Sequence, residues 1–139
     1  MTTNDIQQLL DQLPDLCAEG FGASACDPRA TAAQREAKLR ESRVQLLEST
    51  EECSAAEQWL KLQPKTDRIN REISSYGLKN ESEEDKQTYI SNGAFIAAAF
   101  HAGFSVRHTP FSPNAHLNIG KRVRSVRSAQ LGSEDKDFR

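Results

Sequence analysis

The chain of 139 residues lacks the features that define several protein classes. Hydrophobic residues make up 37% of it and aromatic residues only 6%, which predicts a small core. No apolar run approaches the roughly 20 residues of a membrane-spanning helix, and the opening MTTNDIQQLL has no basic region of the kind that begins a signal peptide. The cysteines Cys17, Cys26 and Cys53 are an odd set without a CxxC pair. We therefore expect a cytoplasmic protein with reduced, partly buried thiols, and neither a disulfide scaffold nor a membrane protein.

Motifs for catalysis and for cofactors are also missing. The chain has no GxSxG sequence and no phosphate-binding loop. His101, His108 and His116 recur at intervals of seven and eight residues, which match no metal-binding motif. No glycine-rich or strand-turn-helix context surrounds a cysteine, so a Cys–His catalytic pair is not indicated. We expect no enzymatic activity, no metal ion and no cofactor.

What the sequence does have is a separation of charge along the chain. Residues 1–64 hold six Lys and Arg against eleven Asp and Glu, a net charge of −5, whereas residues 65–139 hold twelve against nine, a net charge of +3. No acidic residue lies between Asp85 and Glu134. A basic segment of this kind binds phosphates or an acidic protein face. The candidate nucleic-acid-binding residues, within the segment 86–127, are Lys86, Arg107, Lys121, Arg122, Arg124 and Arg127.

Acidic residues form two further candidate surfaces. Residues 81–85 hold four carboxylates near the expected C-terminal end of a helix, where the helix dipole disfavours negative charge, so a basic partner is favoured there. The acidic N-terminal half is expected to expose carboxylates on its helices and to dock on a basic protein surface. The candidate partner-binding residues are Glu48, Glu51, Glu52, Glu81, Glu83, Glu84 and Asp85.

The spacing of apolar residues predicts three helices in the first half, over residues 4–13, about 28–48 and 50–62, with a loop over residues 14–26. Asn4 is the expected cap of the first helix, and Asp27-Pro28 supplies a carboxylate cap and a proline for the start of the second. Ser49 with Glu52 resembles a capping box that starts the third helix. A single long helix over residues 28–62 is the alternative. The residues expected on the buried face of the second helix are Ala33, Ala37, Val44 and Leu47, with Leu39 and Leu46 widening this face.

The second half predicts a short helix followed by a helical pair. The expected elements are a short helix capped by Thr66 or Asp67 and running through Ile69 and Ile73, a helix over residues 75–84 and a helix over residues 92–102. Ser91 caps the last helix, and Gly103 followed by Phe104 fits a Schellman end. Gly93, Ala97 and Ala98 on the same helix are small enough to let another helix approach closely. Trp59, Phe95, Ile96 and Phe100 are the expected large core residues.

These elements predict a mostly α fold of five or six short-to-medium helices, with at most one small β hairpin after residue 104. Residues 1–64 form an acidic helical half. Residues 65–122 form the helical pair and a proline-containing segment, packed with the first half as one domain. Residues 123–139 are polar, and we expect a weakly ordered tail.

The second half also carries a pattern that resembles known sequences. The pattern consists of Tyr76-Gly77-Leu78-Lys79, YISNGAFIAAA over residues 89–99, Gly103-Phe104, Pro113-Asn114-Ala115 and Asn118-Ile119. It is similar to small uncharacterised proteins encoded by bacterial phages, plasmids and integrated elements, over roughly residues 65–122. Those proteins often have histidine at the position of Asn80. The resemblance implies an origin in a bacterial mobile element and supplies no mechanism.

Two functions fit these observations. The first is a non-enzymatic accessory protein of a mobile element that binds a host protein or protein–nucleic acid complex, of which an inhibitor of a host defence system is one concrete form. The second is a nucleic-acid-binding regulator that uses the basic segment 86–127. The helices over residues 75–84 and 92–102 are spaced like a helix-turn-helix motif, but the second helix lacks Arg, Lys and Gln. Its composition predicts a core helix instead.

Overall fold

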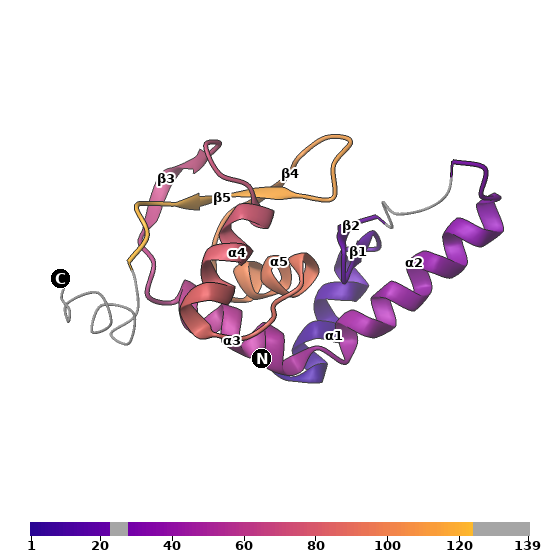
Figure 1. The fold of residues 1–139 in the computed structure, drawn as a ribbon, viewed down its shortest axis with the longest axis horizontal. Helices are drawn as coiled ribbons and strands as arrows, with labels where there is room; N and C mark the ends of the chain where they lie inside the picture. The colour runs from indigo at the N-terminus through magenta and orange to yellow at the C-terminus, as the bar shows by residue number, and fades with distance from the viewer. Residues whose placement is uncertain (23–27, 124–139) are drawn as a thin grey trace.

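Helices dominate the fold (Figure 1). The computed structural model describes residues 1–22 and 28–123, and within these ranges it has five helices and five strands. The helices are α1 (Thr3–Gln12), α2 (Ala32–Leu47), α3 (Thr50–Leu60), α4 (Ser75–Lys86) and α5 (Asn92–His101). The strands are β1 (Leu16–Cys17), β2 (Gly20–Phe21), β3 (Lys65–Asn70), β4 (Val106–His108) and β5 (Ala115–Ile119). The mostly helical prediction is confirmed, but the strands exceed the single predicted hairpin.

Helix α5 is the central element of the fold (Figure 1). It contacts α1, α3, α4, β2 and β4, and residues 92–99 are all buried. Ser91 caps it, because the Ser91 hydroxyl accepts a hydrogen bond from the Ala94 N–H. At the other end Gly103 has φ of +87°, and the N–H groups of Gly103 and Phe104 bond back to carbonyls of the last turn, as in a Schellman motif. Both predicted ends and the predicted core character of this helix are confirmed.

The core joins side chains from both halves of the chain. Trp59, Phe95 and Ile96 are fully buried, as predicted, whereas Phe100 is only partly buried at the edge of the core. The rings of Trp59 and Phe95 lie 6.1 Å apart and are tilted, an arrangement that aromatic pairs prefer. Residues from every helix contribute to this cluster, together with residues from β1 and β5.

The caps of the first two helices differ from the predicted ones by two and four residues. Helix α1 starts at Thr3, and Thr2 rather than Asn4 caps it, through a capping box with Asp5. Helix α2 starts at Ala32 rather than after Asp27-Pro28: Thr31 and Gln34 exchange the two hydrogen bonds of a capping box, which satisfies the first N–H groups better than the earlier start. Pro28 precedes the helix, and Asp27 lies outside the described residues.

Two separate helices follow, as predicted, and the single long helix is wrong. The predicted Ser49–Glu52 capping box is wrong as well. Ser49 does precede α3, but its hydroxyl donates to the Gln45 carbonyl, and Glu52 bonds to Ser91 instead. The Ser49 and Glu52 side chains therefore bond to α2 and to the residue before α5, and neither forms the predicted hydrogen bonds at the start of α3.

The predicted buried face of α2 is confirmed only toward the end of the helix. Leu46 is buried and Leu47 is partly buried against the core, as predicted, but Ala33 and Ala37 are exposed and Val44 is 49% exposed. Ser42, which was not predicted, is also buried. The first half of α2 projects away from the other elements (Figure 1). Apolar spacing alone could not reveal this, because burial requires a second element on that side.

A three-stranded antiparallel sheet, in the order β3-β5-β4, covers α4 and α5 (Figure 1). The pairing of β4 with β5 confirms the predicted hairpin after residue 104. The short helix predicted through Ile69 and Ile73 is wrong, since residues 65–70 form the edge strand β3. The Asn70 side chain ties this strand to the Ile119 carbonyl. A further hairpin, β1–β2, lies in the segment predicted as a loop.

Candidate functional site

A hollow of about 510 Å³ opens where the first hairpin, α2, α4, the start of α5 and the segment before β5 meet. This volume lies within the roughly 300–1,000 Å³ typical of ligand pockets. We call it the tyrosine pocket. It is lined by Ala18, Glu19, Gln45, Tyr76, Lys79, Tyr89, Ser91, Asn92, Pro113 and Asn114.

Asn92, the first residue of α5, holds the walls of the pocket together. Its amide nitrogen donates to the Glu19 carbonyl at 3.1 Å and to the Asn114 side-chain oxygen at 3.0 Å. Its amide oxygen accepts from the Ser75 hydroxyl at 2.9 Å, which itself accepts from the N–H of Ala115. A single buried side chain thus links α4, α5, the first hairpin and the segment before β5.

Two glycines allow the first hairpin to approach this closely. A Cβ atom on Gly93 would lie 1.8 Å from the Cys17 carbonyl oxygen, and the Gly93 N–H donates to the Ala18 carbonyl at 3.0 Å. A Cβ atom on Gly20 would lie 2.2 Å from the Pro113 carbonyl oxygen, and Gly20 has φ of +119°, which favours glycine. The predicted close approach at Gly93 is therefore made by the hairpin rather than by another helix.

Two tyrosines flank the opening of the pocket. Tyr76 on α4 is 53% exposed and Tyr89 in the α4–α5 turn is 65% exposed. The Lys79 ammonium lies 5.0 Å from the centre of the Tyr76 ring and 5.3 Å from that of Tyr89. Lys79 itself is buried and pairs with Glu83 at 3.3 Å. The Lys79 ammonium therefore contacts both rings as a cation–π partner, and Glu83 balances its charge.

Glu19, in the turn of the first hairpin, is the acidic residue among those that line the pocket. The atom Glu19 Oε1 is buried, and no hydrogen-bond donor of the described residues reaches it. Buried carboxylate oxygens nearly always accept a hydrogen bond, because desolvation without one is costly. One of the residues that line the pocket thus has a buried acceptor that lacks a donor in the described part of the chain.

The predicted partner-binding carboxylates are used in different ways. Glu52 accepts from the N–H of Ser91 at 2.8 Å, and Glu83 accepts from the N–H of Ile90 at 2.9 Å, so both hold the turn that carries Tyr89. Glu48 and Glu51 are exposed near the junction of α2 and α3. Glu52 and Glu83 therefore position a turn that lines the pocket, although neither residue lines it.

The carboxylates of α4 do not form one acidic face. Glu81 pairs with Arg122 at 3.0 Å, and Asp85 is buried, with only 2% of its surface exposed. Glu84 is exposed. The run of acids in the sequence is distributed over different sides of the helix.

The predicted basic residues are also spread out. Lys86 donates to the Gln58 side chain, Arg107 is exposed on β4, and Lys121 is exposed after β5. Arg124 and Arg127 lie outside the described residues. A second hollow, of about 500 Å³, lies along β3 and is lined by Lys121 and Arg122 together with Arg68, which sequence reasoning did not single out.

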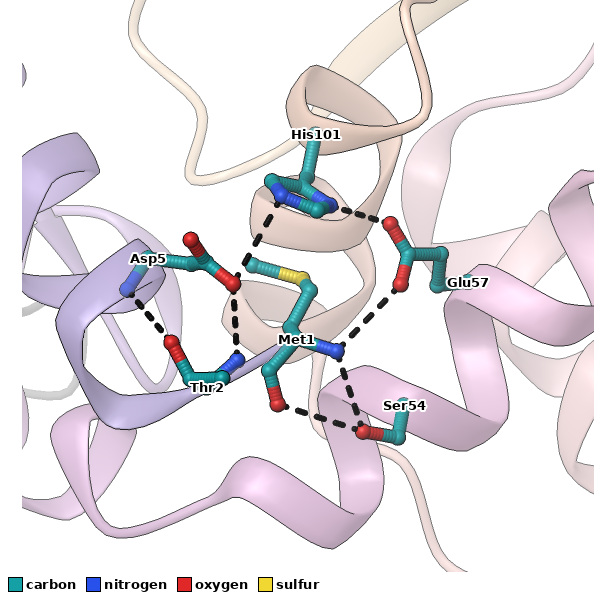
Figure 2. Close-up of polar contacts among 6 residues, drawn as sticks. All are labelled: Met1, Thr2, Asp5, Ser54, Glu57 and His101. Carbon is teal, nitrogen blue, oxygen red and sulfur yellow. Dashed lines mark hydrogen bonds and ion pairs between the residues drawn. The ribbon is translucent and has the colours of Figure 1, made fainter.

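A polar cluster joins α1, α3 and α5 on another part of the molecule (Figure 2). His101 lies between two carboxylates: its Nδ1 contacts Glu57, and its Nε2 lies 3.6 Å from Asp5. Glu57 also pairs with the amino group of Met1 at 3.3 Å. Burial acts to raise the pKa of Glu57, but the hydrogen bond and charge of His101, together with the amino group of Met1, outweigh burial and lower the pKa below its ordinary value.

A backbone hydrogen bond from Thr2 lowers the pKa of Asp5 in the same cluster. Neither ring nitrogen of His101 contacts a hydroxyl or thiol among the residues drawn in Figure 2. The contacts of His101 with Asp5 and Glu57 join α5 to α1 and α3.

The remaining candidate groups are the cysteines and possible metal ligands. Burial raises the pKa of Cys53 to about 12, which keeps its thiol protonated at neutral pH. Cys17 and Cys53 are buried and free, and Cys26 lies outside the described residues. Within residues 1–22 and 28–123 there is no group of three His, Cys, Asp or Glu side chains placed to hold a metal ion. No helix in these ranges is long and apolar enough to cross a membrane.

The residues that line the tyrosine pocket come largely from the pattern that carries the mobile-element resemblance. Tyr76, Lys79, Tyr89, Asn92 and Asn114 belong to three separate segments of that pattern and meet at the pocket. Sequence reasoning did not identify this site, although the pattern itself was a signal for it. Glu19 carried no such signal. Comparison of the chain with protein-family models, with curated proteins and with solved structures finds no match.

Proposed function

We propose that this protein is a non-enzymatic binding protein that recognises a host protein through the tyrosine pocket. The observation that carries the proposal is the pair of half-exposed tyrosines over a hollow whose walls are fixed by buried hydrogen bonds. Tyrosine is enriched among residues that dominate binding energies, because it supplies a large rigid surface at low entropic cost.

Rigidity of the walls supports the same proposal. Asn92 is buried and fully hydrogen-bonded, and Lys79 is held between Glu83 and the two rings. A binding surface that needs no reordering loses less entropy on association. We further propose that the partner belongs to the host of a mobile element, as the resemblance implies, and that inhibition of a host defence system is one form such binding takes.

Affinity capture from a bacterial host lysate, with and without nuclease, tests this proposal. The wild-type protein is compared with a Tyr76→Ala/Tyr89→Ala variant and with Leu62→Ala, which removes another large exposed side chain away from the pocket. We expect a nuclease-resistant protein partner that the Leu62 variant retains and the double tyrosine variant loses. Capture that survives loss of both tyrosines contradicts the proposal.

A second candidate function is nucleic-acid binding by the sheet. Arg68, Lys121 and Arg122 line one hollow along β3, Arg107 is exposed on β4, and the Phe111 side chain at the tip of the β4–β5 loop is fully exposed. Cations with an exposed aromatic ring suit a phosphate backbone and its bases. Binding to duplex DNA should then weaken with salt, by a log–log slope of about −0.9 for each phosphate neutralised. Binding that does not change with salt contradicts this function.

A further inference from the structure

We propose, on the basis of the function proposed above, that the tyrosine pocket receives an arginine side chain of the partner protein. The buried acceptor Glu19 Oε1 is the first reason. An ionised carboxylate only accepts hydrogen bonds, so a ligand that satisfies this atom must bring a donor. A guanidinium has five N–H donors in a planar fork that matches a carboxylate.

The tyrosine rings are the second reason. Tyr76 and Tyr89 keep about half or more of their surface exposed, although Lys79 lies against both rings. A guanidinium stacks on aromatic faces and remains hydrogen-bonded at its edge. One arginine can therefore contact a tyrosine ring with its plane and Glu19 with its N–H groups.

The charge around the opening is the third reason. Gln45 on α2 lines the pocket, and Glu41 and Glu48 lie four residues before it and three residues after it, on the same side of the helix. Both carboxylates are exposed. A cationic side chain is attracted to such a rim, and the attraction raises the rate of association.

An anionic ligand fits less well, even though a lysine lines the pocket. The Lys79 ammonium is only 9% exposed at its side chain and pairs with Glu83, which also holds the N–H of Ile90. An anion would have to displace Glu83 or the tyrosine rings to reach it. Lys79 thus stabilises the rings and leaves Glu19 as the available charged group.

Peptide titration followed by ¹H–¹⁵N NMR tests the inference with the full chain. The probes are four capped pentapeptides, each with a central residue between glycines: arginine, citrulline, lysine or glutamate. Citrulline has the shape of arginine without its charge. We expect the arginine peptide to shift the side-chain amide signals of Asn92 and Asn114 saturably, about tenfold more tightly than citrulline or glutamate.

Matched variants locate the contact. Glu19→Gln should weaken arginine binding about tenfold or more and leave thermal stability unchanged, because no donor among residues 1–22 and 28–123 bonds to the Oε1 atom that it alters. Glu51→Gln, which neutralises an exposed carboxylate outside the pocket, should bind like the wild type. Equal binding of the citrulline peptide, tighter binding of the lysine or glutamate peptide, no binding of any peptide, or unchanged binding by Glu19→Gln would overturn the inference.

The captured host partner separates this inference from the proposed function. If the partner is lost from the double tyrosine variant but retained fully by Glu19→Gln, the arginine inference fails and the proposed function stands. If the double tyrosine variant retains the partner, the proposed function itself fails.

Discussion

Replacing Gly93 with alanine should separate the first hairpin from α5 and open the tyrosine pocket. The new Cβ atom would lie 1.8 Å from the Cys17 carbonyl oxygen and 2.9 Å from Ala18 Cα, and both are backbone atoms. Ordinary contact begins near 3.4 Å, so the hairpin or the helix must move by about 1.6 Å. Such a movement breaks the hydrogen bond from the Gly93 N–H to the Ala18 carbonyl.

The free energies involved can be compared. Overpacking of a well-packed site costs about 1–3 kcal/mol, and loss of the buried hydrogen bond about 1 kcal/mol. Alanine in a helix recovers up to about 1 kcal/mol relative to glycine. Since the clash is with backbone, which cannot rotate away, we expect a net loss of about 2–3 kcal/mol, which lowers Tm by roughly 6–12 °C.

Thermal and urea unfolding measure this loss, and NMR shows where the chain moves. Gly77→Ala is the matched control: Gly77 also lies in the first turn of a helix, but its Cβ would meet only the side chain of Ile73. The Ile73 side chain, whose Cγ1 lies 2.9 Å from that Cβ, can rotate whereas a backbone carbonyl cannot, so we expect the control to lose less than about 1 kcal/mol. If Gly93→Ala unfolds at the wild-type midpoint with unchanged Asn92 side-chain signals, the close approach of the hairpin is not what builds the pocket.

Three further predictions concern the framework of the fold. Phe95→Ala should cost about 3–5 kcal/mol by urea unfolding, because the ring is fully buried; wild-type stability would contradict the core assignment. Arg43→Ala should lower the free energy of unfolding by about 2–3 kcal/mol, because the guanidinium donates to four carbonyls around the end of α1. Its control, Arg40→Ala at an exposed position, should change it by less than about 0.5 kcal/mol. Equal effects of the two changes would refute this. Because folding lowers the pKa of Glu57, its ionised carboxylate adds to the free energy of unfolding. This contribution is complete above the ordinary pKa of 4.5 and is lost as the pH falls through the folded pKa. Between pH 6 and pH 3, the free energy of unfolding measured with urea should therefore fall less steeply for Glu57→Gln than for the wild type. Parallel curves for the two proteins would contradict the assignment.

Local signals in the sequence predicted the central helix well. Ser91 and Gly103 specify the two ends of α5 by hydrogen bonds within a few residues of each end, and the small and aromatic residues between them specify burial. The separation of α2 from α3 was predicted for the wrong reason, since the Glu52 carboxylate bonds to Ser91, 39 residues further along the chain.

The edge strand β3 was missed because its evidence is not local. Its residues are mostly polar and exposed, and the side-chain bond that ties Asn70 to the Ile119 carbonyl spans 49 residues. Apolar residues four apart, Ile69 and Ile73, suggested a helix by spacing alone. Pairing across such a distance cannot be recognised from one sequence without knowing the rest of the sheet.

The tyrosine pocket was beyond sequence reasoning for the same reason. Glu19 and Asn92 are 73 residues apart and meet only because Gly93 lets the hairpin approach α5. The charge pattern pointed to carboxylates as binding residues, but Glu52 and Glu83 use theirs to hold the backbone of the α4–α5 turn. Charge in a sequence does not distinguish a side chain that meets solvent from one that satisfies a backbone donor.

The most direct test is the dissociation constant of the purified host partner, measured by titration calorimetry against three forms of the protein. The tyrosine pocket account predicts that Tyr76→Ala/Tyr89→Ala raises Kd by about 30-fold or more, as loss of a binding hot spot does. It predicts that a sheet variant without the exposed cations Arg68, Arg107 and Lys121 binds within about twofold of the wild type. The opposite pattern, with the tyrosine variant unchanged and the sheet variant weakened, would contradict the account.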